Sequence, residues 1–260
     1  MATVQDAMPD LGRDLTFYPT DNPSPKTLTA AQVEQYNERG YVFPLDVFSD
    51  AEVVEHRAYF DQLMDDAVAK GWNSFSINGW QARCTGIYDL VNEPRILDYV
   101  QDLLGENLIC WATHYFSKLP GDTKKVAYHQ DASYWPMTPS RTVTLWLAID
   151  DSDTENACMR VIPGSHKHGH LSWRPSESAE DNVLDQTVEQ PEQFGEAPED
   201  LILRAGEMSL HSDLLLHGSD RNESERRRCG LTMRYAASSV RAYMGWHEKG
   251  VVCRGDDPDG

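Results

Sequence analysis

The hydrophobic pattern of this chain changes near residue 105, and this change limits the folds that the chain can adopt. Before that point, apolar residues follow helix-start signals at helical spacing. After it, short stretches rich in β-branched and aromatic residues are separated by Gly, Pro and Asp. Helices followed by many short strands predict an α+β chain with a β-sandwich or barrel core. Because 260 residues suit one such core, we expect a single domain over residues 1–260.

Helix-start signals predict three helices in the first part of the chain. Two are capping boxes, in which a hydroxyl residue precedes an acidic or amide residue by three positions. The third helix begins with a proline, a residue that suits the first turn, and ends at a glycine. The signals are Thr29/Gln32, Ser49/Glu52 with a helix to about Lys70, and Pro94 with Leu104 before Gly105. We expect residues 40–44 to form a strand and the Pro- and Asp-rich residues 1–27 to form an extended arm.

Strand signals fill the rest of the chain. The clearest is Thr142–Ile149, where Val143 and Leu145 begin an apolar face and Thr144 and Trp146 lie on the other face. Further strands are predicted at Leu108–Phe116, Cys158–Ile162, Leu201–Arg204, Glu207–His211 and Gly230–Ala236. The acidic, polar stretch 174–200 is expected to be a surface loop or lid.

The triplet His129-Gln130-Asp131 is the first candidate for chemistry. On a strand, residues two apart point to the same face, roughly 6.5–7 Å apart at Cα, so an imidazole and a carboxylate can meet at one metal ion. With a second, distant histidine they would form the two-His-one-carboxylate set of non-haem Fe(II) oxygenases. Chance alone predicts about one His-x-Asp in such a chain, so the triplet by itself is weak. A second copy, His211-Ser212-Asp213, is present, and the surrounding sequence must decide between them.

The sequence around the first copy is far more specific. After His129 come Tyr134, Trp135 and Pro136, then the alternating strand, then the stretch from Glu155 to Lys167 with its Pro-Gly-Ser-His. Later stand His217-Gly-Ser219 and, eleven positions after His217, Arg228. This ordered series resembles the phytanoyl-CoA dioxygenase family of Fe(II)- and 2-oxoglutarate-dependent oxygenases, from about Thr29 to Ser238.

The resemblance implies a double-stranded β-helix, a jelly roll of the cupin kind, with flanking N-terminal helices. It implies Fe(II), 2-oxoglutarate and O2 as the reactants at the metal centre. His129, Asp131 and His217 match the iron ligands. The matches for 2-oxoglutarate are Arg228 for the distal carboxylate, Ser219 beside it, and Trp146 and Gln130 in the pocket wall. Related halogenases have a small residue at the carboxylate position, so Asp131 favours hydroxylation.

Alternatives to these assignments stay open. His211 and Asp213 share strand parity with His217 and form a rival triad, or support the metal from outside its coordination sphere. Arg226 and Arg227 compete with Arg228, because neighbouring strand residues face opposite ways. His166 is expected to fix a loop rather than bind metal. The candidates for the substrate pocket are Trp135, Arg83, His114, Lys118, Arg160 and Arg234, and the cations among them could equally be members of structural ion pairs.

The net charge and the cysteines limit the partners and the cellular location that we expect for this protein. The formal net charge of −19 disfavours nucleic acid, whose binding depends on Lys and Arg. Five cysteines without a C-x-x-C pair predict neither a disulfide framework nor a zinc knuckle. The N-terminus lacks the features of a signal peptide, and no apolar run is long enough to span a bilayer. We therefore expect a soluble cytoplasmic protein without a membrane partner, and the sequence does not define its oligomeric state.

The substrate is a small molecule in every interpretation that we favour. A small polar or zwitterionic metabolite, such as an amino acid, an ectoine-like solute or an aminophosphonate, is the first expectation. A natural-product scaffold is the second. Two other classes remain: a jelly-roll sensor that binds metal without turnover, and a cupin-like enzyme with another metal and no cosubstrate.

Overall fold

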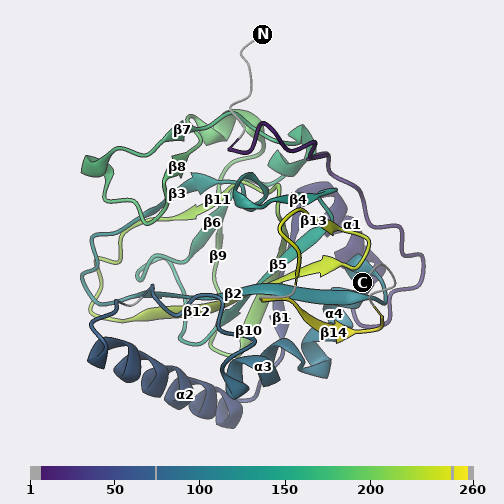
Figure 1. Ribbon diagram of the computed structural model, residues 1–260. Helices are drawn as coiled ribbons and strands as arrows, with labels where there is room; N and C mark the ends of the chain where they lie inside the picture. The colour runs from purple at the N-terminus through teal and green to yellow at the C-terminus, as the bar shows by residue number, and fades with distance from the viewer. Residues whose placement is uncertain (1–6, 74, 247–248, 257–260) are drawn as a thin grey trace.

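A computed structural model describes residues 7–73, 75–246 and 249–256 of the chain (Figure 1). Its main element is a six-stranded antiparallel sheet in the order β1-β10-β5-β12-β2-β14. A smaller antiparallel sheet has the order β3-β11-β6-β9. The larger sheet consists of β1 (Tyr41–Asp46), β2 (Leu108–Lys118), β5 (Thr142–Ala148), β10 (Glu207–Ser212), β12 (Arg228–Ala237) and β14 (Val251–Arg254). The smaller sheet consists of β3 (Val126–His129), β6 (Met159–Val161), β9 (Glu199–Leu201) and β11 (His217–Ser219).

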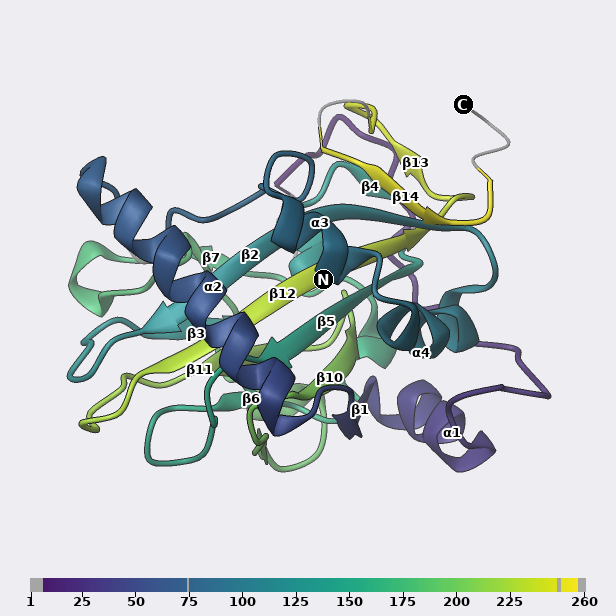
Figure 2. The same cartoon turned by 90° about the horizontal axis from the view of Figure 1, so that it is seen from below.

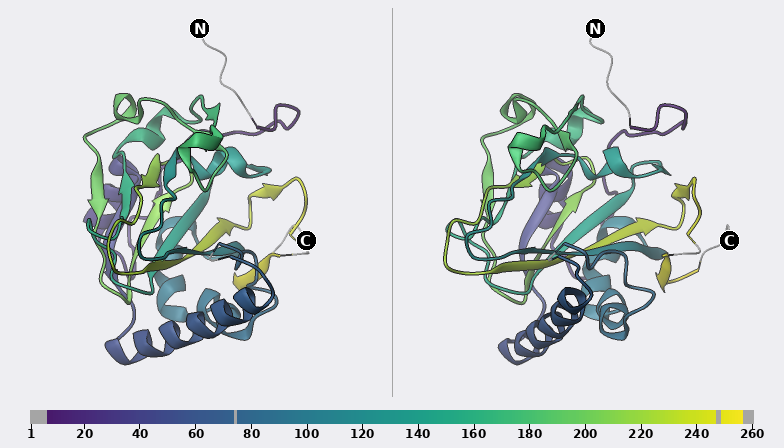
Figure 3. Two further views of the ribbon diagram at one scale, coloured as in Figure 1. Left: turned by 90° about the vertical axis from the view of Figure 1, so that its left-hand side faces the viewer. Right: turned by 60° about the vertical axis from the view of Figure 1, so that its left-hand side comes forward.

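Four α-helices accompany the sheets: α1 (Ala30–Arg39), α2 (Asp50–Ala69), α3 (Thr85–Val91) and α4 (Pro94–Leu104). Figures 2 and 3 show α2 crossing the outer face of the larger sheet, with the smaller sheet on the opposite side. Both predicted capping boxes are present, at Thr29 and Ser49, and Pro94 and Gly105 bound α4 as expected. None of the described helices is long and apolar enough to cross a membrane.

The alternating strand β5 explains how the two layers hold together. Val143, Leu145 and Leu147 belong to the large apolar core beneath the helices. On the other face, Trp146 and Ala148 pack with residues of the smaller sheet in a second core between the sheets. Both faces of β5 are therefore buried, and its polar-looking face with Thr144 points into the space between the sheets. These two antiparallel sheets form the jelly roll that the resemblance implied.

Several local predictions need correction. The stretch 174–200 is not one loop: it contains the paired strands β7 (Arg174–Pro175) and β8 (Gln186–Thr187), and it ends in β9. The strand expected at Leu201–Arg204 lies earlier, at Glu199–Leu201. Helix α3 and the pair β4 (Met137–Thr138) and β13 (Arg241–Ala242) were not predicted. Residues 7–27 contain no helix or strand, as expected for the arm, whereas residues 1–6 lie outside the described part.

Candidate active site

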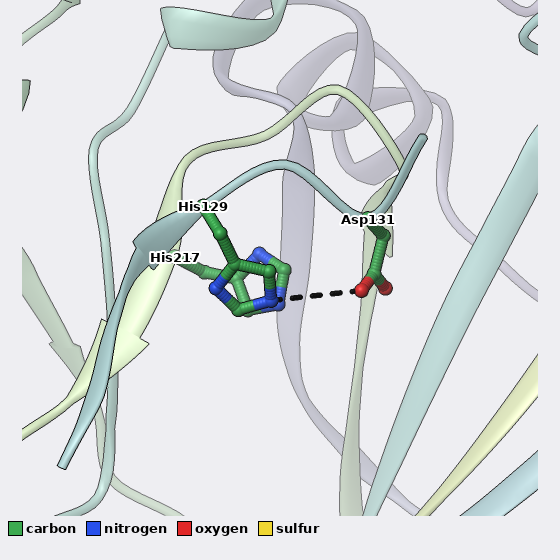
Figure 4. Close-up of side chains that lie close together, drawn as sticks. All are labelled: His129, Asp131 and His217. Atoms are coloured by element: carbon green, nitrogen blue, oxygen red, sulfur yellow. Dashed lines mark ion pairs between the residues drawn. The ribbon is translucent and has the colours of Figure 1, made fainter. Parts of the chain in front are cut away.

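Strand pairing brings the two histidines together. His129 ends β3, His217 begins β11, and the two are direct partners in the register of these strands. Each Nδ1 lies at hydrogen-bond distance from a backbone carbonyl, 2.9 Å from Ala127 O for His129 and 3.0 Å from Leu215 O for His217. If Nδ1 is the donor in both rings, each Nε2 keeps a lone pair for a metal. The ring centroids are 4.2 Å apart (Figure 4).

Asp131 completes the group from a different element. It is the first residue of the 3-10 helix η1 (Asp131–Tyr134), so the expectation that His129 and Asp131 share a strand is wrong. The turn nevertheless brings the Asp131 carboxylate to face the histidines, with Oδ1 3.6 Å from His129 Nε2 (Figure 4). One ligand atom from each of His129, Asp131 and His217 lies within 4.8 Å of the others. Among the described residues this is the group able to hold a metal ion.

Three residues that lie side by side on the larger sheet surround Oδ2 of Asp131. Thr144 on β5 pairs with His211 on β10 and with Arg234 on β12. Thr144 Oγ1 donates a hydrogen bond of 2.7 Å to Asp131 Oδ2. Arg234 Nε lies 3.8 Å and His211 Nε2 lies 3.9 Å from the same oxygen. Because these three residues lie around Oδ2, the other oxygen, Oδ1, faces the histidines. The sequence predicted the face of β5 on which Thr144 lies, but it predicted no role for Thr144.

The electrostatics suit a divalent cation. Burial by itself raises the pKa of Asp131, but Arg234 and the two nearby imidazoles outweigh it and hold that pKa well below its usual value. Burial, with His129 and His211 close by, lowers the pKa of His217 well below its usual value. The group thus combines a carboxylate with neutral imidazole, the protonation states in which these side chains bind metal. Two imidazole nitrogens and one carboxylate oxygen are the donor set of non-haem Fe(II) oxygenases.

The rival triad does not form. Asp213 accepts hydrogen bonds from Ser140 Oγ at 2.5 Å and from Thr142 Oγ1, away from His217. His211 lies behind Asp131, with its ring centroid 4.6 Å from that of His217. Of the second His-x-Asp, His211 therefore lies beside the site and Asp213 bonds away from it, and a supporting role for the pair stays a prediction.

A buried cation lies further into the same cavity. Arg228 is 3% exposed, its Nη2 donates to Ser219 Oγ at 3.2 Å, and its Cζ lies 5.6 Å from the centre of the Trp146 ring. Its neighbours turn outward: Arg226 bonds to Asp153, and Arg227 bonds to Asp150. Arg228 Nε has no hydrogen-bond partner among the described residues. A buried guanidinium with free donors is suited to an anionic ligand.

These groups line one cavity of about 40 Å³ between the two sheets. Its wall is formed by Phe116, Val126, His129, Asp131, Thr144, Trp146, Met159, His211, His217, Gly218, Ser219, Arg228, Thr232 and Arg234. The three metal-binding candidates and Arg228 thus line a single cavity.

Comparison with known proteins gives the class of this site. A family model described as phytanoyl-CoA dioxygenase matches residues 36–230, which is most of the chain and includes the three metal-binding candidates. The chain belongs to the phytanoyl-CoA dioxygenase family. It is therefore a non-haem iron dioxygenase that uses Fe(II), 2-oxoglutarate and O2.

Individual relatives agree with this assignment. The peroxisomal phytanoyl-CoA dioxygenase of Rattus norvegicus is 26% identical over 256 residues, which cover 86% of this chain and 72% of the rat protein. The solved structure of the apo non-heme monooxygenase ThoJ has a TM-score of 0.72 at 26% identity, and covers 86% of this chain and 84% of its own. EctD from S. alaskensis, solved with 2-oxoglutarate and 5-hydroxyectoine, has a TM-score of 0.74 at 20% identity over 88% of this chain and 84% of its own, and so supports the fold alone.

The structure separates the remaining candidates of this dioxygenase into two groups. Arg234 lines the cavity, and its Cζ lies 5.6 Å from the centre of the Trp135 ring. Gln130 does not line it: its amide donates to Gly169 O and Leu214 O and accepts from Leu171 N, so it joins backbone segments instead. The other candidates lie elsewhere: Arg83 is exposed, His114 bonds to Phe75 O, Lys118 to Asp220 O and Arg160 to Asp200. His166 bonds to Asn37 O and packs on Phe17, as expected for a residue that fixes a loop.

Proposed function

We propose that this chain hydroxylates an unactivated C–H bond of a small molecule, with iron bound by His129, Asp131 and His217. The single observation that supports this best is the convergence of the three ligand atoms within 4.8 Å, in a cavity that also contains Arg228. We further propose that Arg228 and Ser219 bind the distal carboxylate of 2-oxoglutarate and that Trp146 forms part of its wall. The products would be the hydroxylated substrate, succinate and CO2.

The iron ion with 2-oxoglutarate and O2 supplies the oxidising chemistry, and the protein supplies geometry and charge. The hydrogen bond from Thr144 orients the Asp131 carboxylate, and Arg234 supplies a positive charge 3.8 Å from the same oxygen. The two backbone carbonyls fix the histidine rings. Burial of all these groups keeps bulk water away from the reacting centre. Since a carboxylate stands at position 131, we propose hydroxylation rather than halogenation.

An anaerobic titration tests the metal assignment. The protein is mixed with Fe(II) and then with 2-oxoglutarate, and we expect a weak metal-to-ligand charge-transfer band in the visible spectrum. Failure of the band to appear at saturating concentrations would remove the basis of the proposal.

Replacement of Asp131 tests its role directly. Asp131→Ala removes the one anionic ligand and leaves Arg234 without its carboxylate partner. We expect iron binding and coupled succinate formation to fall by at least about 100-fold, within the range seen when catalytic electrostatic groups are removed. Asp150→Ala, which removes a carboxylate that pairs with Arg57 and Arg227 instead, is the control for general loss of charge. Undiminished hydroxylation by Asp131→Ala would contradict the assignment.

The two other classes give different results in simple assays. A metal-binding sensor would not release succinate, whereas an oxygenase slowly decarboxylates 2-oxoglutarate even without substrate. A cupin-like enzyme without cosubstrate would keep its activity after Arg228→Ala. The small-molecule substrate and the cytoplasmic location stay predictions from the sequence.

A further inference from the structure

The size of the iron cavity raises the question of where the substrate lies. In the proposed function this cavity, of about 40 Å³, is already occupied by the iron ion and 2-oxoglutarate. A second cavity of about 320 Å³ lies among Trp111, Tyr134, Met137 and residues of the stretches 242–246 and 249–250. If the proposed function holds, the body of the substrate must lie outside the iron cavity, and the second cavity has the room for it.

The two cavities are one layer of side chains apart. Tyr134 lines the second cavity, and its ring centroid is 6.0 Å from that of His129. Trp111 also lines the second cavity, and it packs edge-on against Trp135 at 5.0 Å. Trp135 in turn contacts Arg234, which lines the iron cavity. A molecule in the second cavity would therefore lie one layer of side chains from the metal centre.

The walls of the second cavity are apolar and aromatic. Three aromatic rings, two methionines and a proline contribute to it, and its remaining members are small residues and one lysine: Trp111, Tyr134, Pro136, Met137, Ala242, Met244, Gly245, Trp246, Lys249 and Gly250. Flat aromatic rings favour flat apolar ligands, which stack on them or meet them edge-on.

The backbone around the cavity is fixed by specific features. Trp111 is the unpaired residue of a β-bulge in β2, where Arg234 faces Ala112 and Tyr235 faces Cys110. Such bulges re-aim a side chain next to active sites. The buried amide of Gln81 donates to Trp111 O at 3.0 Å and to Lys249 O at 2.7 Å, which ties two walls together.

The charge of the lining is unusual for this chain. The protein has 42 acidic and 23 basic residues, yet none of the described residues that line the second cavity is acidic. Lys249 lies in its wall, and Arg234 lies on the other side of Trp135. A cationic ligand would meet Lys249 there and would find no carboxylate among the described wall residues.

We propose that this cavity binds the body of the substrate, and that the substrate is a flat, largely apolar organic molecule without positive charge. The inference rests on the proposed function and favours a natural-product scaffold over an aliphatic zwitterion. The matched family segment ends at residue 230, and six of the ten described wall residues lie beyond it, in 242–246 and 249–250. Most of the described wall thus lies outside the matched region, while the metal site lies inside it.

Binding of a fluorescent dye tests the cavity without any turnover. The full-length protein with Fe(II) and 2-oxoglutarate is titrated anaerobically with 8-anilinonaphthalene-1-sulfonate, a flat anionic molecule. We expect one saturable site, weakened at least about tenfold by Trp246→Ala, which removes a ring, and by Ala242→Phe, which fills the space. Trp72→Ala, on a tryptophan that is 46% exposed elsewhere, is the matched control and should leave the affinity unchanged. Equal affinity in all four proteins would overturn the proposal.

A turnover assay tests the same cavity as a substrate site. Succinate release is measured with 2-naphthoate and with glycine betaine as compounds of the two opposing kinds. We expect 2-naphthoate to stimulate release in the wild type and to do so far less in Ala242→Phe, whereas betaine has no effect. Stimulation by betaine alone would refute the substrate class. Absence of the charge-transfer band would instead refute the iron assignment, so the two failures are distinguishable.

Discussion

Two buried cations are neighbours on adjacent strands, and one of them, Arg228, lines the iron cavity. Arg228 on β12 and Lys118 on β2 are partners in strand register, and Lys118 is 1% exposed. Burial, followed by the effect of Arg228, lowers the pKa of Lys118 from 10.5 to about 7. Burial also lowers the pKa of Arg228 to about 10. Keeping two positive charges here costs folding free energy, which an anionic ligand such as 2-oxoglutarate would offset.

The Lys118 pKa predicts a pH dependence of stability. Between about pH 7 and pH 10.5 the unfolded chain binds the Lys118 proton and the folded chain does not, so the free energy of unfolding rises with pH in this window. Below pH 7 Lys118 is protonated in both states, so the folded protein carries the full free-energy cost of burying its charge. We expect Lys118→Met to be more stable than the wild type at pH 7 and to show a flatter pH profile, because methionine has no charge to bury.

Urea unfolding at several pH values measures this effect. The exposed Lys26→Met serves as the control for loss of one charge. A Lys118→Met profile parallel to that of the wild type would show that Lys118 keeps its ordinary titration in the folded protein.

Arg228 and Ser219 together form the site that we propose for the distal carboxylate of 2-oxoglutarate. Arg228→Gln removes the buried guanidinium and leaves Ser219 without its donor. We expect the Kd for 2-oxoglutarate to rise by roughly 30–100-fold, since a charge-assisted bidentate pair contributes about 2–3 kcal/mol. Iron binding should change little. Arg226→Gln, on the exposed neighbour that bonds to Asp153, is the matched control, and an equal effect of both variants would argue against a specific site.

At the scale of elements, the close approach of β12 and β5 depends on one glycine. A Cβ atom at Gly230 would lie 2.0 Å from Cζ2 of Trp146, so the indole occupies the space that any other residue would need. Gly230→Ala must displace Trp146 and its contact with Arg228. We expect a loss of about 1–3 kcal/mol in the free energy of unfolding, typical of overpacking, together with weaker 2-oxoglutarate binding.

A double variant provides the control for this steric argument. Gly230→Ala with Trp146→Phe has a smaller ring at the point of conflict, so urea unfolding should show recovered stability relative to Gly230→Ala alone. If Trp146→Phe adds its own loss without any recovery, the clash is not the cause.

At the scale of the whole molecule, the core and the metal site are largely separate. The large apolar cluster lies between the helices and the larger sheet, whereas two of the metal-binding candidates belong to the smaller sheet. The protein should therefore stay folded without metal. Fe(II) with 2-oxoglutarate at about 100 times the Kd should add about 2.7 kcal/mol of stability. For a chain of this size that raises Tm by roughly 5–10 °C.

Thermal unfolding followed by circular dichroism measures this shift. Chelation of the metal should return Tm to the metal-free value without loss of secondary structure at room temperature. Complete unfolding on chelation would mean that the metal holds the two sheets together.

The sequence by itself determined the elements whose signals are local. Capping boxes at Thr29 and Ser49 and the alternation in Thr142–Ile149 depend only on near neighbours, and they were predicted correctly. The ordered series around His129 was enough to give the family and the fold. Two-residue strands such as β4 and β13 have no such signal, because a pattern of period two cannot be recognised in two residues.

Only the tertiary structure decided which side chains share a space. It placed Arg228 inside and Arg226 and Arg227 outside, and it turned Asp213 away from His217. It also joined Trp111, Tyr134 and Trp246 in one aromatic cavity. The physical reason is that strand register, bulges and turns between distant segments set these positions, and a change of one residue in register reverses the direction of every side chain in a strand.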